Sequence, residues 1–320
     1  MGRKNNALTW YMNRDIILAD FMNGALYGGE KVIAPEELAE IQRTYQENMY
    51  NRNGRKRRTL RERDVARAFC KKGHMIILAV ENQNTPNLCM PLRNLEYDVE
   101  DFVRQLRRLR RRYQEKGGLK GEIEYLSGIR KTDRLIPVVT LVFYHGKEKW
   151  DGPLQLQDML DMEEMDQTLK ALHMNYRLCV IHLSDLEEKN FETGLRELIG
   201  LMKRRDDKKA MQIFCRENES RFRKMDDETY DVICAMISQE LQLKKEKCRD
   251  QGKETVDMCR AIDEMVKDGE IRGEKRGEKR GEEKMSRLIS CLCKEGRTED
   301  IGRAADNIQV RRRLYREYGI

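Results

Sequence analysis

The sequence lacks a long apolar run and a cysteine framework. No stretch approaches the roughly 18 apolar residues of a transmembrane helix, and the segment MGRKNNALTWYMNRD has no signal-peptide core. The nine cysteines are odd in number and include no CxxC pair for zinc, while Cys291 and Cys293 are too close for a structural disulfide loop. These absences predict a reduced, cytoplasmic protein without a membrane partner.

Apolar residues are scarce relative to charged ones. They make up 39% of the 320 residues, against 37% for charged residues, and the mean hydropathy is −0.81. The apolar residues gather in the first two thirds, and the last third is charged and helix-forming. We therefore expect an α/β domain over residues 1–190, a helical extension over 191–270, and a charged repetitive arm with a terminal helical segment over 271–320.

The net charge of +7 is modest, so the distribution of charge matters more than its total. Two basic clusters stand out, which are Arg55, Lys56, Arg57 and Arg58 in a polar segment, and five arginines between residues 107 and 112. Such clusters suit a polyanion, although a solvated surface would have the same composition. We expect the first cluster to form a loop over residues 51–58 that contacts double-stranded DNA.

Hydrophobic periodicity predicts alternating helices and strands. Expected helices cover residues 15–27, 92–115 and 154–171, and expected strands cover 63–70, 75–83, 136–144 and 176–183. The run at 136–144 is almost continuously apolar, as in a strand covered on both faces. This order predicts an α/β sandwich with a mixed sheet.

The first two expected strands form a hairpin around Lys72 and Gly73. A two-residue loop places Asp64 opposite Glu81, and a three-residue loop moves the register by about one position. Glu81 and Gln83 lie on one face because side chains alternate along a strand. Two carboxylates and an amide then converge, and a divalent cation is the usual compensation for such like charges.

Magnesium fits this set, with manganese as a substitute, because it takes one or two carboxylates and keeps several waters. Asp64 and Glu81 would be ligands, and Asp20 on the first helix would hold an outer water or a second metal. Other interpretations stay open: Asp64 beside Arg61 and Arg63 also fits a surface ion pair, and a carboxylate at a helix edge, like Asp20, needs no ligand.

These segments resemble the recombination-promoting nuclease / putative transposase family of the PD-(D/E)XK nuclease superfamily. The matching stretches are ILADFMNGALYGGEKVIAPEEL, RERDVARAF, ILAVENQNTPNLCMPLRNLEYD and PVVTLVFYHGKEKWDGP. The resemblance implies a restriction-endonuclease-like core that cuts DNA, with Asp64, Glu81 and Gln83 as catalytic residues. It also implies a supporting role for Arg93 and Tyr97. The superfamily usually has lysine at the position of Gln83, and glutamine is neither a charged electrophile nor a base.

The C-terminal third contains GEKR repeated with a period of four. We expect a marginal helix or a flexible arm there, ending in a helical cap or an oligomerisation element. Three functions fit the sequence: a metal-dependent DNA endonuclease linked to recombination or mobile DNA, a catalytically weak or inactive nuclease fold that binds DNA, and an oligomeric interaction protein. Magnesium-dependent nicking of a plasmid would separate the first from the others.

Overall fold

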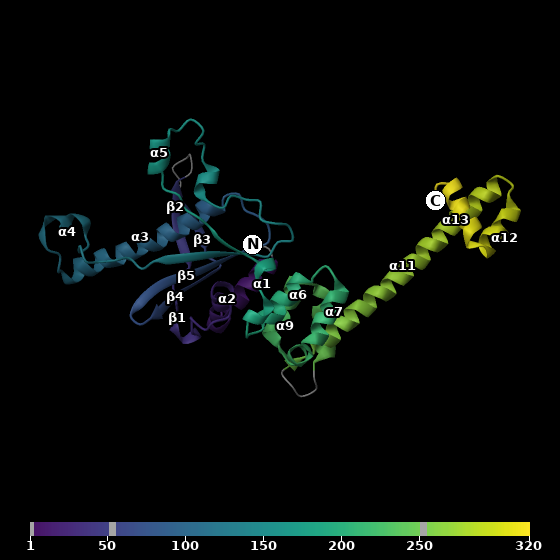
Figure 1. Cartoon of the computed structure of the whole chain (residues 1–320), viewed down its shortest axis with the longest axis horizontal. Helices are drawn as coiled ribbons and strands as arrows, with labels where there is room; N and C mark the ends of the chain where they lie inside the picture. Colours follow the sequence, from purple (N-terminus) through teal and green to yellow (C-terminus); the bar gives the residue numbers. More distant parts are fainter. Residues whose placement is uncertain (1–2, 51–55, 250–254) are drawn as a thin grey trace. The chain divides into compact units, whose positions relative to one another are not determined.

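The computed structural model describes residues 3–50, 56–249 and 255–320, in two compact units (Figure 1). Met1–Cys259 contain the sheet, and Arg260–Ile320 form the second unit. The structure thus divides the chain differently from our expectation. Residues 191–259 belong with the sheet, and the expected boundary at 270/271 falls inside the long helix α11 (Met258–Lys294).

The remaining helices of the described chain fall into α-helices and short 3-10 turns. The α-helices are α1 (Arg3–Met12), α2 (Asp15–Tyr27), α3 (Met90–Lys116), α4 (Gly121–Ser127), α5 (Gln167–Leu172), α6 (Leu195–Lys203), α7 (Lys208–Glu217), α8 (Glu219–Phe222), α9 (Asp227–Met236), α10 (Gln239–Gln242), α12 (Thr298–Asp306) and α13 (Ile308–Glu317). The 3-10 turns are η1 (Pro35–Glu37), η2 (Leu156–Met159), η3 (Leu183–Asp185), η4 (Glu188–Asn190) and η5 (Glu246–Cys248).

The strands form one main sheet and two small ones. Their bounds are β1 (Leu38–Glu40), β2 (Thr44–Tyr50), β3 (Lys56–Glu62), β4 (Val65–Lys71), β5 (His74–Gln83), β6 (Val138–Tyr144), β7 (Cys179–His182), β8 (Met225–Asp226) and β9 (Thr255–Val256). The main sheet has the order β1-β4-β5-β6-β7, while β2 pairs with β3 and β8 with β9. Because β5, β6 and β7 run parallel and the other pairs run antiparallel, the sheet is mixed, as predicted.

The β4–β5 hairpin is closed by a two-residue turn at Lys72 and Gly73. Both residues have positive φ, at 49° and 80°. Positive φ at both central positions is typical of a type I′ turn, whose twist matches that of the flanking strands. The turn therefore selects the two-residue alternative for the loop.

The hairpin register follows from this turn. Val65 pairs with Val80 near the open end. Continued by one position, this register sets Asp64, directly before β4, opposite Glu81 on β5. The predicted pairing of these two positions is confirmed, although β4 begins at Val65 rather than at residue 63.

Helices cover both faces of the main sheet. On one face, the ring of Phe21 from α2 lies 5.0 Å from that of Phe143 on β6. On the other, Arg93 of α3 contacts Glu81 of β5. Successive residues of a strand point to opposite faces, so Glu81 lies on the α3 face and its neighbour Asn82 on the α1/α2 face.

Helix α2 has the bounds predicted from the sequence, Asp15–Tyr27. It ends where Gly28 adopts a left-handed conformation (φ 61°, ψ 24°) that caps the last turn. The glycine that follows Tyr27 in the sequence therefore marks the end of the helix.

Two expected elements are corrected. The expected basic loop over 51–58 is wrong from Lys56 onward, because Lys56, Arg57 and Arg58 belong to β3, which pairs with β2; Arg55 lies outside the described residues. The expected helix over 154–171 is replaced by η2 and the short α5, which begins where the side chain of Asp166 caps it. For the GEKR repeat, where a marginal helix or a flexible arm was expected, the structure shows a helix, which is part of α11.

No helix within the described ranges is both long and apolar enough to cross a membrane.

Candidate active site

Asp64 and Glu81 come together at the open end of the β4–β5 hairpin, and both side chains are buried. One carboxylate oxygen of Asp64, Oδ2, accepts a hydrogen bond from the backbone N–H of Asn82 at 2.8 Å. The Glu81 carboxylate in turn receives a backbone hydrogen bond from Asp64. The hairpin register thus holds the two acids against each other through main-chain donors.

Burial makes both carboxyls reluctant to ionise. Burial, followed by the charge of Asp64, raises the pKa of Glu81 to about 8, and the nearby Arg93 opposes the shift. Burial also raises the pKa of Asp64, against the hydrogen bond from Asn82. Two adjacent acids cannot both be charged at low cost without a compensating cation.

The raised pKa of Glu81 predicts how the metal-free stability depends on pH. An unfolded glutamate titrates near 4.5, so between about pH 4.5 and 8 the native state holds the extra proton. The free energy of unfolding should therefore fall as pH rises through this window, by up to about 1.4 kcal/mol per pH unit from this group. The measurement is urea unfolding in EDTA at several pH values.

Glu81→Gln is the matched control, because glutamine resembles the protonated acid in shape and does not titrate. The variant should lose this part of the pH dependence and become the more stable protein near pH 8. Identical slopes for parent and variant would show that Glu81 ionises freely in the folded chain.

Gln83 ends β5 two residues after Glu81, on the same face, and its side chain is half-buried. Its neighbours across the parallel strands are Tyr144 on β6 and, beyond it, His182 on β7. Directly paired residues project to one face of a sheet. Gln83, Tyr144 and His182 therefore form a row along the carboxyl edge, starting beside the two acids.

A cavity of about 590 Å³ lies at the far end of this row. It is lined by Tyr144 and His182, by the loop after β6 and by residues at the end of α6. Its charged lining is mostly basic: Lys147, Glu148, Lys149, Lys203, Arg205 and Asp206. The ring of Tyr144 packs edge-on against that of Trp150, with the ring centroids 5.3 Å apart. The edge thus runs from two acids to a basic hollow.

Arg93 and Tyr97 project from α3 onto the acid pair. Nη2 of Arg93 lies 3.1 Å from Oε2 of Glu81. The ring of Tyr97 lies between two guanidinium groups, with Arg63 at 5.2 Å and Arg93 at 5.6 Å. Its hydroxyl donates to the backbone carbonyl of Glu62 at 3.3 Å. Arg93 therefore contacts Glu81 directly, and Tyr97 lies against Arg93.

A buried ionic network adjoins the site and was missed in the sequence. Arg63 is fully buried; its Nη2 lies 2.6 Å from Asp98 and 3.2 Å from Asp101, both on α3. Its Nη1 donates to Thr140 on β6 at 2.8 Å, and Tyr176 donates to Asp98 at 2.6 Å. Arg63 therefore pairs with α3 and not with the neighbouring Asp64.

A signal for this network exists in the helix pattern. The buried positions of α3 include Met90, Asn94, Tyr97, Asp98 and Asp101, at spacings of three and four along one face. Polar residues on the same helical face as Met90 and Tyr97 therefore also point toward the sheet. Acids on such a face need a buried cation, and Arg63 is that cation.

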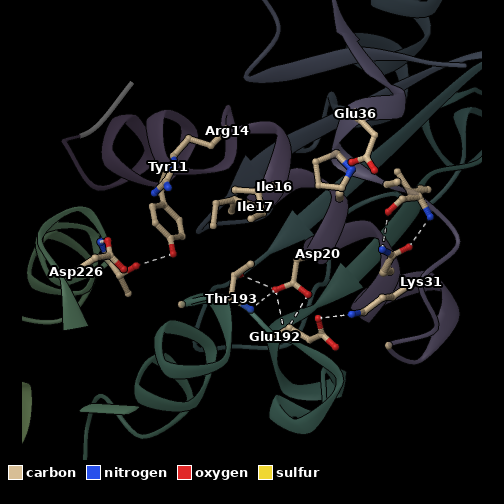
Figure 2. Close-up of a pocket in the computed structure, with 18 residues that line it drawn as sticks. Tyr11, Arg14, Ile16, Ile17, Asp20, Lys31, Glu36, Glu192, Thr193 and Asp226 are labelled. Atoms are coloured by element: carbon tan, nitrogen blue, oxygen red, sulfur yellow. Dashed lines mark hydrogen bonds and ion pairs between the residues drawn. The ribbon is translucent and has the colours of Figure 1, made fainter. Parts of the chain in front are cut away.

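The structure does not bring Asp20 to this pair. Asp20 lies on α2, and its carboxylate accepts hydrogen bonds from the backbone N–H groups of Glu192 (3.0 Å) and Thr193 (2.9 Å) and from the Thr193 hydroxyl (2.5 Å). It lines a separate cavity beside α2, with Lys31 and Glu192 paired at its rim (Figure 2). We therefore leave Asp20 out of the candidate metal site.

The donor set at the acid pair fits a hard divalent cation. Asp64 Oδ1 and Glu81 Oε1 are buried, and none of the described residues donates a hydrogen bond to them. Among the described residues, no group of three or more His, Cys, Asp or Glu side chains is arranged to hold a metal. A two-carboxylate site matches magnesium, which completes its shell with water and phosphate oxygens.

Comparison with known proteins identifies a family for this chain. A family model described as "Putative transposase, YhgA-like" matches residues 68–229, just over half of the chain. The matched range begins within β4 and ends within α9, so it includes Glu81, Gln83, Arg93 and the carboxyl edge. No curated protein and no solved structure matches this chain.

Proposed function

The chain belongs to the YhgA-like putative transposase family, and from this membership we propose that it is a metal-dependent DNA endonuclease that acts on mobile or recombining DNA. The observation that carries the proposal is the buried pair Asp64 and Glu81, with raised pKa values and two carboxyl oxygens that lack a donor among the described residues. Buried acids with raised pKa values are a common sign of a reactive centre. We assign the site to the PD-(D/E)XK type on this basis.

Asp64 and Glu81 would hold the cation, which is Mg²⁺ with Mn²⁺ as a substitute. Bound there, the metal would polarise a phosphodiester and lower the pKa of a water. Arg93, which is partly exposed, contacts Glu81 and can neutralise part of the negative charge of the acids and of the phosphate. Gln83 can orient water or a phosphate oxygen through its amide.

The carboxyl edge supports a polyanionic substrate. The row Gln83, Tyr144 and His182 spans two strand spacings, about 10 Å, and leads to the basic hollow. A DNA strand cut at the acid pair would pass its neighbouring phosphates along this row. The cations of the hollow would hold the backbone without reading its sequence.

The direct test is cleavage of supercoiled plasmid by the purified chain with Mg²⁺, with Mn²⁺ and with EDTA. We expect nicked or linear product with either metal and none with EDTA. Salt-dependent DNA binding without any cleavage would overturn the endonuclease proposal. It would leave the second candidate, a nuclease fold that only binds DNA, which the burial of Glu81 beneath Arg93 favours.

Gln83 offers a sharper test of the assigned site. Gln83→Lys should keep measurable cleavage, because an ammonium can contact phosphate or water from the same face of β5. Gln83→Leu, similar in bulk but without a hydrogen-bonding group, should lose on the order of 10²-fold in rate. The measurement is single-turnover cleavage at saturating Mg²⁺. Near-parental rates in both variants would place Gln83 outside the reacting centre.

A further inference from the structure

The C-terminal end of the chain is a three-helix unit with its own small core. Leu288 and Leu292 of α11, Ala304 of α12 and Leu314 of α13 are fully buried against one another. Partly buried apolar residues surround them: Met285, Ile301, Val310, Tyr315, Tyr318 and Ile320. The end of α11 is therefore packed against α12 and α13, as the yellow part of Figure 1 shows.

The connections within this unit are short and firmly capped. Between α11 and α12, Gly296 has a positive φ of 71°, and Arg297 donates its backbone N–H to Leu292 at 2.9 Å. Between α12 and α13 there is Asn307 alone, whose side chain accepts hydrogen bonds from the N–H groups of Gln309 (2.8 Å) and Val310 (3.3 Å). These caps fix the direction in which α13 leaves the turn.

Helix α13 carries a polar, basic face opposite its buried side. Leu314 and Val310 point into the core, while Gln309, Arg312, Arg313 and Arg316 are exposed. The exposed four stand at spacings of three, one and three, which is one face of a helix. Within the described chain no carboxylate forms an ion pair with these three arginines.

We propose that this unit is a second DNA-binding site, in which α13 enters the major groove of a duplex. A single helix fits that groove. Arginine pairs bidentately with guanine and glutamine with adenine, and these are the residue types on the face of α13. Ile308, at the start of the same helix and 52% exposed, can contact a thymine methyl group. The proposal goes beyond cleavage and is independent of it.

The surface of α13 fits a nucleic acid better than a second copy of this chain. An interface between copies would need an apolar centre, and Ile308 is the only large hydrophobic residue of the described α12 and α13 that is strongly exposed. Three neighbouring arginines without acidic partners would repel the same helix of another copy. Phosphate and base edges satisfy all three at once.

The test measures binding of the full chain to a pool of random short duplexes in EDTA, where cleavage is excluded. Sequencing of the bound fraction from the parent should give an enriched sequence. The triple variant Arg312→Gln, Arg313→Gln, Arg316→Gln should lose that enrichment and at least about tenfold in affinity, since each base contact is worth roughly a factor of ten or more. Circular dichroism checks the helical content, and the single variants Arg312→Gln and Arg313→Gln replace the triple if it unfolds.

The matched control removes the same charge from the exposed part of α11: Lys275→Gln, Arg276→Gln, Lys279→Gln. This variant should keep the enriched sequence. Equal losses in both triple variants, or no loss in either, would overturn the proposal. The proposal would also be overturned if substitution of the α13 arginines changed the oligomeric state of the chain and left DNA binding unchanged. In that case the face would join copies of the chain. If the chain proves not to cleave DNA, this binding assay still tests the proposal, because it does not depend on cleavage.

Discussion

Asp64→Asn and Glu81→Gln should each reduce magnesium-dependent plasmid cleavage by roughly a factor of 100 or more, while the chain stays folded. Each substitution removes one of two anionic ligands from the proposed metal site, and magnesium has few protein ligands to spare. A loss of this size is typical when one electrostatic group is removed from a reacting centre. Cleavage kinetics and circular dichroism are the measurements.

A second readout separates metal binding from chemistry. If Asp64 and Glu81 hold the cation, Mg²⁺ should raise the melting temperature of the parent and not that of either variant, because only the site in the native state binds it. The informative control is Asp20→Asn, which should cleave like the parent, since the carboxylate of Asp20 serves the turn at Thr193. Unchanged cleavage in Asp64→Asn or Glu81→Gln would sink the assignment, and a loss in Asp20→Asn would return Asp20 to it.

The largest effect on stability is expected at Arg63. Arg63→Met removes the cation that lies between Asp98 and Asp101 and leaves two buried acids without it. Breaking a buried ion pair by removing one partner costs about 3–5 kcal/mol. Urea unfolding of parent and variant under one set of conditions measures this cost.

Arg112→Met is the matched control, because the same substitution there breaks a half-exposed pair with Asp133 and should cost at most about 1 kcal/mol. The triple variant Arg63→Met, Asp98→Asn, Asp101→Asn should recover part of the loss, since the uncompensated charges are then gone. Similar costs for Arg63→Met and Arg112→Met would show that the network is not a buried ionic cluster in solution.

The sequence predicted the elements whose limits are set by local chemistry. Helix α2 could be delimited because Gly28 is a left-handed cap, and the hairpin because Lys72 and Gly73 form its turn. The pairing of Asp64 with Glu81 followed from counting along that hairpin. These features depend on residues close together in the chain, so a single sequence contains the information.

The remaining features depend on distant partners. Strands β2 and β3 have no apolar alternation, and among the described strands they pair with each other alone. The apolar residues of 154–171 suggested a long helix, but only η2 and α5 form there. The position of Asp20 was misjudged because its partner Thr193 is remote in sequence. Arg63 was read with its neighbour Asp64 although its partners lie on α3.

The distance from the two-residue turn at Lys72 and Gly73 decides which face of the sheet each side chain of β5 takes. Glu81 and Gln83 lie an odd number of positions after Lys72 and face α3. Asn82 lies an even number of positions after Lys72 and faces the other way. One residue added between the turn and Glu81 would send both side chains to the α1/α2 face and bring Asn82 toward Arg93. Two added residues would restore the face but shift Glu81 past Asp64. Insertions or deletions between the turn and Glu81 should therefore disrupt the site. The number of residues between the turn and Glu81 is as important to the site as the carboxylate itself.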